Sequence, residues 1–193
     1  TLKFELGIQL AASDITLTQN GCTASDKNDL AKLRWATGNL KSTGNVNYVW
    51  ASSQTEGGHF YSFNKLYDGS TGDPCSKLNT AYYGTSWRTP TKNELEKLVR
   101  CTDRVYNGGM WFMNNRLGLF LKAAGMRPET GPGLEGTGSG TSGVYLTSTL
   151  GNRKNTCYVL DFGTTYIVVT DTGAWNALQI NGYSVRCVKG TKQ

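Results

Sequence analysis

The side chains best suited to chemistry in this chain are one histidine and five cysteines. His59 is the only histidine, and it lies in an aromatic, Gly-rich stretch that lacks the context of a nucleophile elbow. A Ser-His-Asp arrangement would have to use this residue, so hydrolytic catalysis is poorly supported. We therefore expect a protein that is not an enzyme and that has no cofactor.

The cysteines are widely spaced, at positions 22, 75, 101, 157 and 187. There is no Cys-x-x-Cys pair, and a single histidine adds little, so zinc ligation is disfavoured. Such spacing in a Gly- and Tyr-rich chain is typical of an oxidising, extracytoplasmic setting. The odd count leaves at least one thiol unpaired within the chain.

Charge and hydropathy argue against a nucleic-acid partner and against a membrane span. The net charge is +6, but the lysines and arginines are scattered, which favours a solvated basic surface over a nucleic-acid-binding stripe. No apolar run approaches the roughly 18 residues that a membrane span requires. We expect neither nucleic acid as a partner nor a membrane span.

A short stretch in the middle of the chain predicts a helix over residues 91–101. Thr91 and Glu94 have the spacing of a capping box, and Pro90 marks the point where an extended segment stops. Leu95, Leu98 and Val99 then form one apolar stripe. Trp87 just upstream is large enough to anchor the helix start in a core.

The N-terminal third predicts less regular structure. Residues 2–10 alternate between apolar and polar side chains, which indicates a half-buried strand, and residues 15–17 suggest a second short one. Residues 26–33 predict a short helix, with Ser25 or Asp26 as its cap, and residues 35–40 a strand leaving it.

Strands are expected to dominate the rest of the chain. Residues 41–86 have little regular pattern apart from packed segments at 48–50 and 59–63, and 125–143 resembles a Gly-rich surface loop. Five further strands are predicted over 117–121, 144–149, 157–162, 166–170 and 183–188. The expected class is α+β, with the 91–101 helix packed on a C-terminal antiparallel sheet.

The region between residues 151 and 181 is the best candidate for a binding site. Tyr, Trp, Asn and Arg make adaptable contacts to proteins or glycans at low entropic cost. The candidate residues of this kind are Asn152, Arg153, Asn155, Tyr158, Tyr166, Trp175, Asn176 and Gln179. The alternative is that Tyr158 and Tyr166 are packed and the remainder is solvated loop.

Five ordered motifs together resemble a known family. They are Trp-Ala-Thr-Gly-Asn at 35–39, Asp-Pro-Cys at 73–75, Trp-Arg-Thr-Pro-Thr at 87–91 with Glu-Leu at 94–95, Leu-Phe-Leu at 119–121 with Ala-Ala-Gly at 123–125, and Gly-Tyr-Ser-Val-Arg-Cys-Val at 182–188. This order is similar to that of the Fibrobacter succinogenes major paralogous domain, a family abundant in surface proteins of Bacteroidetes. The similarity extends over roughly residues 33–190.

The resemblance implies a fold and a function. The family has C-type-lectin-like folds, some members lie at the ends of Bacteroides fimbriae, and others are variable proteins of diversity-generating retroelements. It therefore implies a C-type-lectin-like domain over 25–193, with 1–24 as a strand segment left from an upstream fimbrillin-like sandwich. The implied function is a non-catalytic adhesin at the cell surface or a fimbrial tip. Its partners would be a host or microbial surface glycan or protein and other fimbrial subunits.

Two alternatives stay open beside this one. One is a structural fimbrial subunit assembled by strand addition. The other is a variable receptor of a retroelement. The relation of the fold to the formylglycine-generating enzyme also suggests an oxidase function, which would need a close pair of cysteines. Cys75 and Cys101 are instead separated by the predicted helix, and neither lies in that family's C-terminal cysteine motif.

The resemblance also bears on the cysteines and on calcium. Cys75 and Cys187 stand where the family carries cysteines, which implies a bridge between them; Cys22 with Cys101 is a plausible second pair, and Cys157 is left over.

Calcium-dependent lectins use Glu-Pro-Asn or Gln-Pro-Asp with Trp-Asn-Asp, whereas this chain has Arg-Pro-Glu at 127–129 and Trp-Asn-Ala at 175–177. Only Asp161 and Asp171 are nearby carboxylates, so the sequence does not imply calcium, and we assign no metal ligands.

Overall fold

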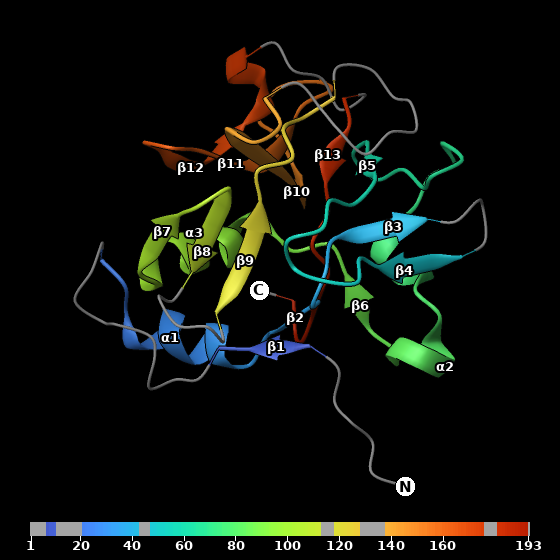
Figure 1. Ribbon diagram of the computed structural model, residues 1–193, viewed down its shortest axis with the longest axis horizontal. Coiled ribbons are helices and arrows are strands. Elements are labelled where there is room, and N and C mark those ends of the chain that lie inside the picture. Colours follow the sequence, from blue (N-terminus) through green and yellow to red (C-terminus); the bar gives the residue numbers. More distant parts are fainter. Residues whose placement is uncertain are drawn as a thin grey trace, which may run out of the picture.

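The computed structural model describes residues 7–10, 21–42, 47–112, 118–127, 138–175 and 181–192. Within these ranges the fold is mixed α+β, with short helices and several small sheets (Figure 1). The helices are α1 (Ala24–Ala31), α2 (Thr80–Tyr83), α3 (Lys92–Cys101) and the 3-10 segments η2 (Pro74–Lys77) and η3 (Thr172–Trp175). The predicted α+β class is confirmed. No helix in the described part of the chain is long and apolar enough to cross a membrane.

The largest sheet has five strands in the order β12-β11-β10-β13-β5. Its neighbours are antiparallel except for the β10–β13 pair, which is parallel. The strands are β5 (Phe60–Tyr61), β10 (Ser142–Leu150), β11 (Cys157–Gly163), β12 (Ile167–Asp171) and β13 (Tyr183–Ser184). The predicted strands at 144–149, 157–162 and 166–170 are therefore confirmed to within two residues at each end.

The remaining strands form three smaller sheets. A four-stranded sheet has the order β1-β2-β14-β6, β3 pairs with β4, and β7-β8-β9 form a third sheet. Their bounds are β1 (Ile8–Gln9), β2 (Arg34–Trp35), β3 (Leu40–Ser42), β4 (Tyr48–Trp50), β6 (Trp87–Arg88), β7 (Arg104–Tyr106), β8 (Gly109–Phe112), β9 (Leu119–Lys122) and β14 (Val188–Lys189). The strands β7 and β8 were not predicted.

Helix α3 begins where the capping box predicts. The Thr91 hydroxyl accepts from the Glu94 N–H at 3.2 Å, and the Glu94 carboxylate accepts from the Thr91 N–H at 2.8 Å. The same carboxylate is fully buried and receives a second hydrogen bond, 2.8 Å long, from the Arg88 guanidinium. Leu95 and Leu98 are buried as expected, and α3 packs on β10, β11, β12 and α1.

The two faces of the large sheet support two cores. Successive strand residues point to opposite faces, so Leu160 and Phe162 of β11 pack under α3 with Leu95. Cys157 and Val159 point to the other face. The second core also contains Leu146, Trp50, Trp87, Tyr183 and Val185. Trp87 is 4% exposed, which confirms its predicted anchoring role.

The structure corrects the predicted helix at 26–33. It spans Ala24–Ala31, and its cap is Thr23 rather than Ser25 or Asp26. The Thr23 hydroxyl accepts from the Asp26 N–H at 3.1 Å, while the Asp26 carboxylate accepts from the Thr23 N–H at 3.1 Å. A second capping box therefore starts this helix two residues earlier, because Asp26 acts as the third helical residue and not as the cap.

Two predicted strands are each divided in the structure. The segment at 183–188 forms β13 and β14, which belong to different sheets. Between them, the carbonyls of Val185 and Cys187 accept hydrogen bonds of 2.9 Å from Leu40 and Ala36. The segment at 35–40 is likewise split between β2 and β3. In both segments, hydrogen bonds between the two segments replace the pairing that one continuous strand would have.

Two disulfides tie distant parts of the chain together. Cys75 bonds to Cys187 across 112 positions, and Cys22 bonds to Cys101 across 79 positions. These are the two pairs expected above, and Cys157 is free and buried. The first joins η2 to the segment between β13 and β14, and the second joins the start of α1 to the end of α3.

The described part of the N-terminal segment packs into the same body. Ile8 and Gln9 pair with Trp35 and Arg34 of β2, and Leu10 is 2% exposed in the core. The predicted strand at 15–17 lies outside the described residues, as does most of the expected loop at 125–143.

Candidate binding surface

The loop at 151–156 joins β10 to β11 and has a defined main-chain shape. The Gly151 N–H donates to the Thr156 carbonyl at 2.9 Å, and the Thr156 hydroxyl donates to the Arg153 carbonyl at 2.8 Å. Asn155 has a φ of 62°, a left-handed conformation that asparagine tolerates better than most residues. Internal hydrogen bonds therefore hold the loop in one conformation.

Asp171 at the end of β12 fixes this loop from the side. Its carboxylate accepts from the N–H groups of Asn152 and Gly173, the latter at 2.9 Å. Burial by itself raises the pKa of Asp171, but hydrogen bonds from Gly173, Asn152 and Thr156 outweigh it and hold the pKa below its ordinary value. The Arg153 guanidinium also donates to the Gly173 carbonyl at 3.2 Å.

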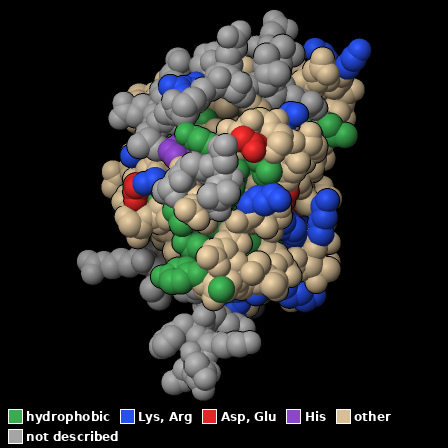
Figure 2. Space-filling view, turned by 90° about the vertical axis from the view of Figure 1, so that its right-hand side faces the viewer, with side chains coloured by type: hydrophobic (Ala, Val, Ile, Leu, Met, Phe, Trp, Pro, Cys, Tyr) green, Lys and Arg blue, Asp and Glu red, His purple; other side chains and the backbone are tan. Residues whose placement is uncertain are grey.

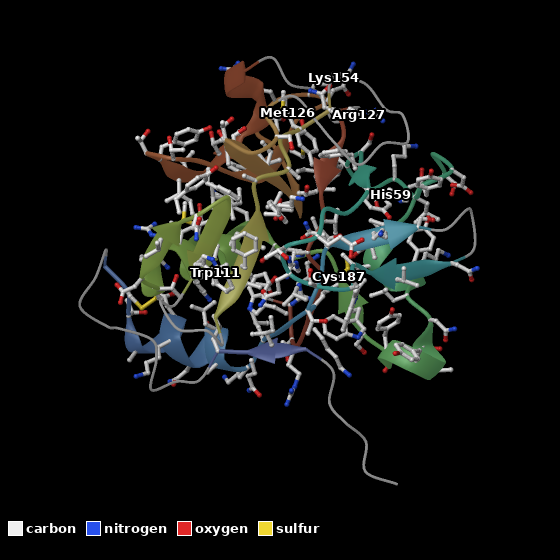
Figure 3. The ribbon with its side chains drawn as sticks, in the orientation of Figure 1. His59, Trp111, Met126, Arg127, Lys154 and Cys187 are labelled. Atoms are coloured by element: carbon white, nitrogen blue, oxygen red, sulfur yellow. A yellow bond between two sulfur atoms is a disulfide. The ribbon has the colours of Figure 1, made fainter. Side chains whose placement is uncertain are left out.

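The loop's side chains face solvent although its main chain is anchored. Asn152, Arg153, Lys154 and Asn155 are all exposed. In Figure 3, Lys154 lies at the top of the molecule, well away from His59 beside β3. A rigid main chain that displays amide and cationic side chains loses little conformational entropy on binding.

Tyr158 joins this surface on the α3 side of the sheet. The Asn152 side-chain amide donates to the Tyr158 hydroxyl at 2.8 Å. Lys92, at the start of α3, places its ammonium 4.3 Å from the centre of the Tyr158 ring, within the range of a cation–π contact. The structure thus brings Asn152, Arg153 and Tyr158 together with Lys92, which the sequence did not indicate.

Tyr166 does not belong to this surface. It is 48% exposed near the turn between β11 and β12, and its hydroxyl donates to Asp161 at 3.1 Å. Asp161 shares its face of β11 with Cys157 and Val159, opposite to that of Tyr158. Burial and the neighbouring Asp161 raise the pKa of Tyr166. The structure therefore does not bring Tyr158 and Tyr166 together on one face of the sheet.

The other predicted site residues are only partly described. The main chain of Trp175 ends η3, close to the Arg153 contact with Gly173. Asn176 and Gln179 lie outside the described residues.

His59 has a structural environment. Its Nδ1 accepts from the Ser42 N–H at 2.9 Å, and its ring lies 5.2 Å from that of Tyr67. Burial and the nearby Lys41 ammonium lower its pKa. Figure 2 shows the histidine (purple) at the surface of this face, with charged side chains (blue and red) near it.

The described carboxylates do not assemble a cation site. Asp171 pairs with Tyr158 across the hairpin, whereas Asp161 lies three residues further along β11 and on the other face. That separation is about 10 Å along the strand. Among the described residues one group of three possible metal ligands occurs, Cys22, Asp26 and Cys101, but its two sulfurs are bonded to each other.

The polar residue that sequence reasoning missed is Arg186. It is 1% exposed, and its guanidinium donates to the Asn39 side chain at 2.9 Å and to the carbonyls of Ala36 and Phe120 at 3.0 and 2.9 Å. Asn39 in turn donates to the Tyr145 hydroxyl at 3.0 Å. Burial lowers the pKa of Arg186 to about 10. Its position between Val185 and buried Cys187 was the available signal.

Comparison of the chain with protein-family models, curated proteins and solved structures found no match.

Proposed function

We propose that this chain is a non-catalytic binding module with a C-type-lectin-like fold, displayed at the cell surface or on a fimbria. The observation that carries the proposal is the 151–156 loop, whose main chain is held by Asp171 and Thr156 while Asn152 and Arg153 face solvent. Such a preformed polar surface binds a ligand without needing reactive groups.

Two further features support an extracellular binding role. Disulfides persist in oxidising compartments, and this chain has two of them closing long loops. The resemblance of the ordered sequence motifs to the major paralogous domain family points the same way. The proposed ligand is a host or microbial surface glycan or protein, and neighbouring fimbrial subunits are the proposed assembly partners.

The alternative of a structural subunit built by strand addition receives less support. Ile8 and Gln9, within the segment that would be donated, already pair with β2 of the same chain. A donated strand leaves its own domain to complete another. We therefore favour binding over assembly for this domain.

The test is a glycan and host-protein array probed with the purified chain and two double variants. Asn152→Ala/Arg153→Ala removes an amide and a cation from the proposed surface. Asn28→Ala/Lys32→Ala removes the same kinds of exposed side chain from α1 and from the residue that follows it. We expect the first to weaken array binding at least about tenfold with a nearly unchanged melting temperature, and the second to bind like wild type.

Equal binding by wild type and the Asn152→Ala/Arg153→Ala variant would remove this surface from the function. A large fall in that variant's melting temperature would mean that these two side chains stabilise the fold instead of binding a ligand.

A further inference from the structure

A pocket of about 370 Å³ lies against strand β10 of the large sheet. This volume is within the range of small-molecule sites. Five chain segments meet at it, and its lining residues are Phe63, Asn64, Asp73, Pro74, Thr89, Leu146, Thr147, Ser148, Leu150 and Lys192.

Strand β10 supplies one wall of the pocket. The pairing of β10 with β11 is irregular between Leu146 and Leu150, and the consecutive residues Leu146, Thr147 and Ser148 all line the pocket. Thr149 is not among the lining residues, and its hydroxyl accepts from the Lys92 N–H at 3.0 Å. The pocket lining contains none of Asn152, Arg153 and Tyr158, so the pocket is distinct from the loop surface.

The carboxylate in the pocket lining already accepts hydrogen bonds from the protein itself. Asp73 accepts 3.0 and 2.7 Å hydrogen bonds from the Cys75 N–H and the Thr89 hydroxyl on one oxygen, and a 2.9 Å bond from the Thr89 N–H on the other. Lys192 contributes the opposite charge to the lining. A lining with one negative and one positive group favours a neutral ligand over an ion.

The Ser148 side chain brings to the pocket a polar group without a hydrogen-bond partner in the described part of the chain. Its hydroxyl oxygen is buried and finds no hydrogen-bond partner among the described residues, although its N–H donates to the Pro90 carbonyl at 2.8 Å. A buried hydroxyl without a partner costs free energy in the empty protein. A ligand hydroxyl placed between the Leu146 and Leu150 side chains would satisfy it.

We propose that this pocket binds one neutral pyranose ring, the terminal residue of a glycan. A pyranose has an apolar C–H face and a rim of hydroxyls. The Phe63, Pro74, Leu146 and Leu150 side chains suit that face, while the Ser148 hydroxyl and the Asn64 amide suit the rim. The inference rests on the proposed function of a binding module and names a ligand class for a second site.

The experiment is a saturation-transfer and chemical-shift titration with neutral methyl pyranosides, in both anomeric forms. Cyclohexanol and phenol serve as probes that share the apolar body but lack the hydroxyl rim. We expect at least one pyranoside to bind more tightly than both probes. Binding of the probes alone, or of nothing, would overturn the proposal.

Two variants place the ligand in this pocket. Leu150 is 64% exposed at the rim, so Leu150→Trp fills the opening without disturbing the core. Val168 is 43% exposed on edge strand β12, so Val168→Trp is the matched control. We expect Leu150→Trp to weaken pyranoside binding at least about tenfold and Val168→Trp to leave it unchanged; equal binding by both would contradict the assignment.

Ser148→Ala tests the unused hydroxyl itself. We expect it to weaken binding about three- to tenfold, the effect of one neutral hydrogen bond, without lowering the melting temperature. Unchanged binding would exclude Ser148 from the site.

Failure here is distinguishable from failure of the proposed function. If pyranosides do not bind while array binding still requires Asn152 and Arg153, the pocket proposal falls and the binding module stands. If wild type binds neither pyranosides nor any array ligand, both fall.

Discussion

His59 illustrates how a titratable residue is used in this molecule. Its Nδ1 accepts a hydrogen bond from the Ser42 N–H, and Lys41 lies nearby, paired with Glu56. Both burial and the Lys41 charge favour the neutral ring, so the pKa of His59 lies below its ordinary value. Protonation would turn the acceptor into a donor that faces the Ser42 N–H.

The resulting prediction concerns stability against pH. The unfolded chain binds a proton near pH 6.5, whereas the folded chain resists doing so, and stability depends on that difference. We expect the free energy of unfolding to be constant above about pH 7 and to fall as the pH decreases below 6.5. The measurement is urea denaturation from pH 7.5 to 5.

The control for this prediction is His59→Asn, whose side-chain oxygen keeps an acceptor near the Nδ1 position but does not titrate. Glu56 does not titrate in this window, because its hydrogen bond with Lys41 and those with Ser52 lower its pKa to about 2. Identical pH profiles for the two proteins would show that His59 is not responsible.

At the scale of elements, α3 connects local sequence signals to tertiary packing. Glu94 caps the helix by accepting from the Thr91 N–H and also pairs with Arg88 of β6. The capping contacts lie within three residues, whereas the Arg88 pair links the helix start to the four-stranded sheet. One fully buried carboxylate therefore serves two elements.

We predict different costs for the two halves of this arrangement. Thr91→Ala removes the cap and should cost on the order of 1 kcal/mol. Glu94→Ala also leaves the Arg88 guanidinium without its carboxylate and should cost about 3–5 kcal/mol. Urea denaturation measures both, and a smaller loss for Glu94→Ala than for Thr91→Ala would contradict the buried ion pair's role.

At the scale of the whole molecule, the disulfides and the Arg186 cluster hold together segments that are distant in sequence. Cys75–Cys187 closes a separation of 112 residues and Cys22–Cys101 one of 79. In the chain-entropy model a loop of either length is worth roughly 4–5 kcal/mol, although that mechanism is disputed. Arg186 adds hydrogen bonds from the last segment to Ala36, Asn39 and Phe120.

The matching prediction concerns thiols. Cys157 is fully buried, and burial raises its pKa to about 12, so it should not react in the native protein. A thiol reagent should find none in the folded chain, one after unfolding without reductant, and five after reduction. Reduction should also lower the melting temperature sharply. Non-reducing peptide mapping gives the pairing, and any bridge involving Cys157 would contradict it.

Local patterns in the sequence were sufficient for several elements. The start and stripe of α3 depend on residues three or four apart, and β10, β11 and β12 follow from alternation within single segments. Hydrogen bonds and periodicities of this range are determined by near neighbours. Among the site residues, Asn152, Arg153 and Tyr158 come together because only a short loop separates them.

Other features depend on contacts between distant segments, and only the tertiary structure decided them. Residues 183–188 divide into two strands because Val185 and Cys187 pair with segments some 150 residues away. Tyr158 and Tyr166 separate because the side chains of a strand alternate between faces and only the packing of α3 shows which face is which. The pocket draws its lining from five segments that are separate in the sequence, so no local pattern predicts it. Sequence alone therefore predicted the parts built from neighbouring residues, while long-range pairing and packing determined how those parts form sites.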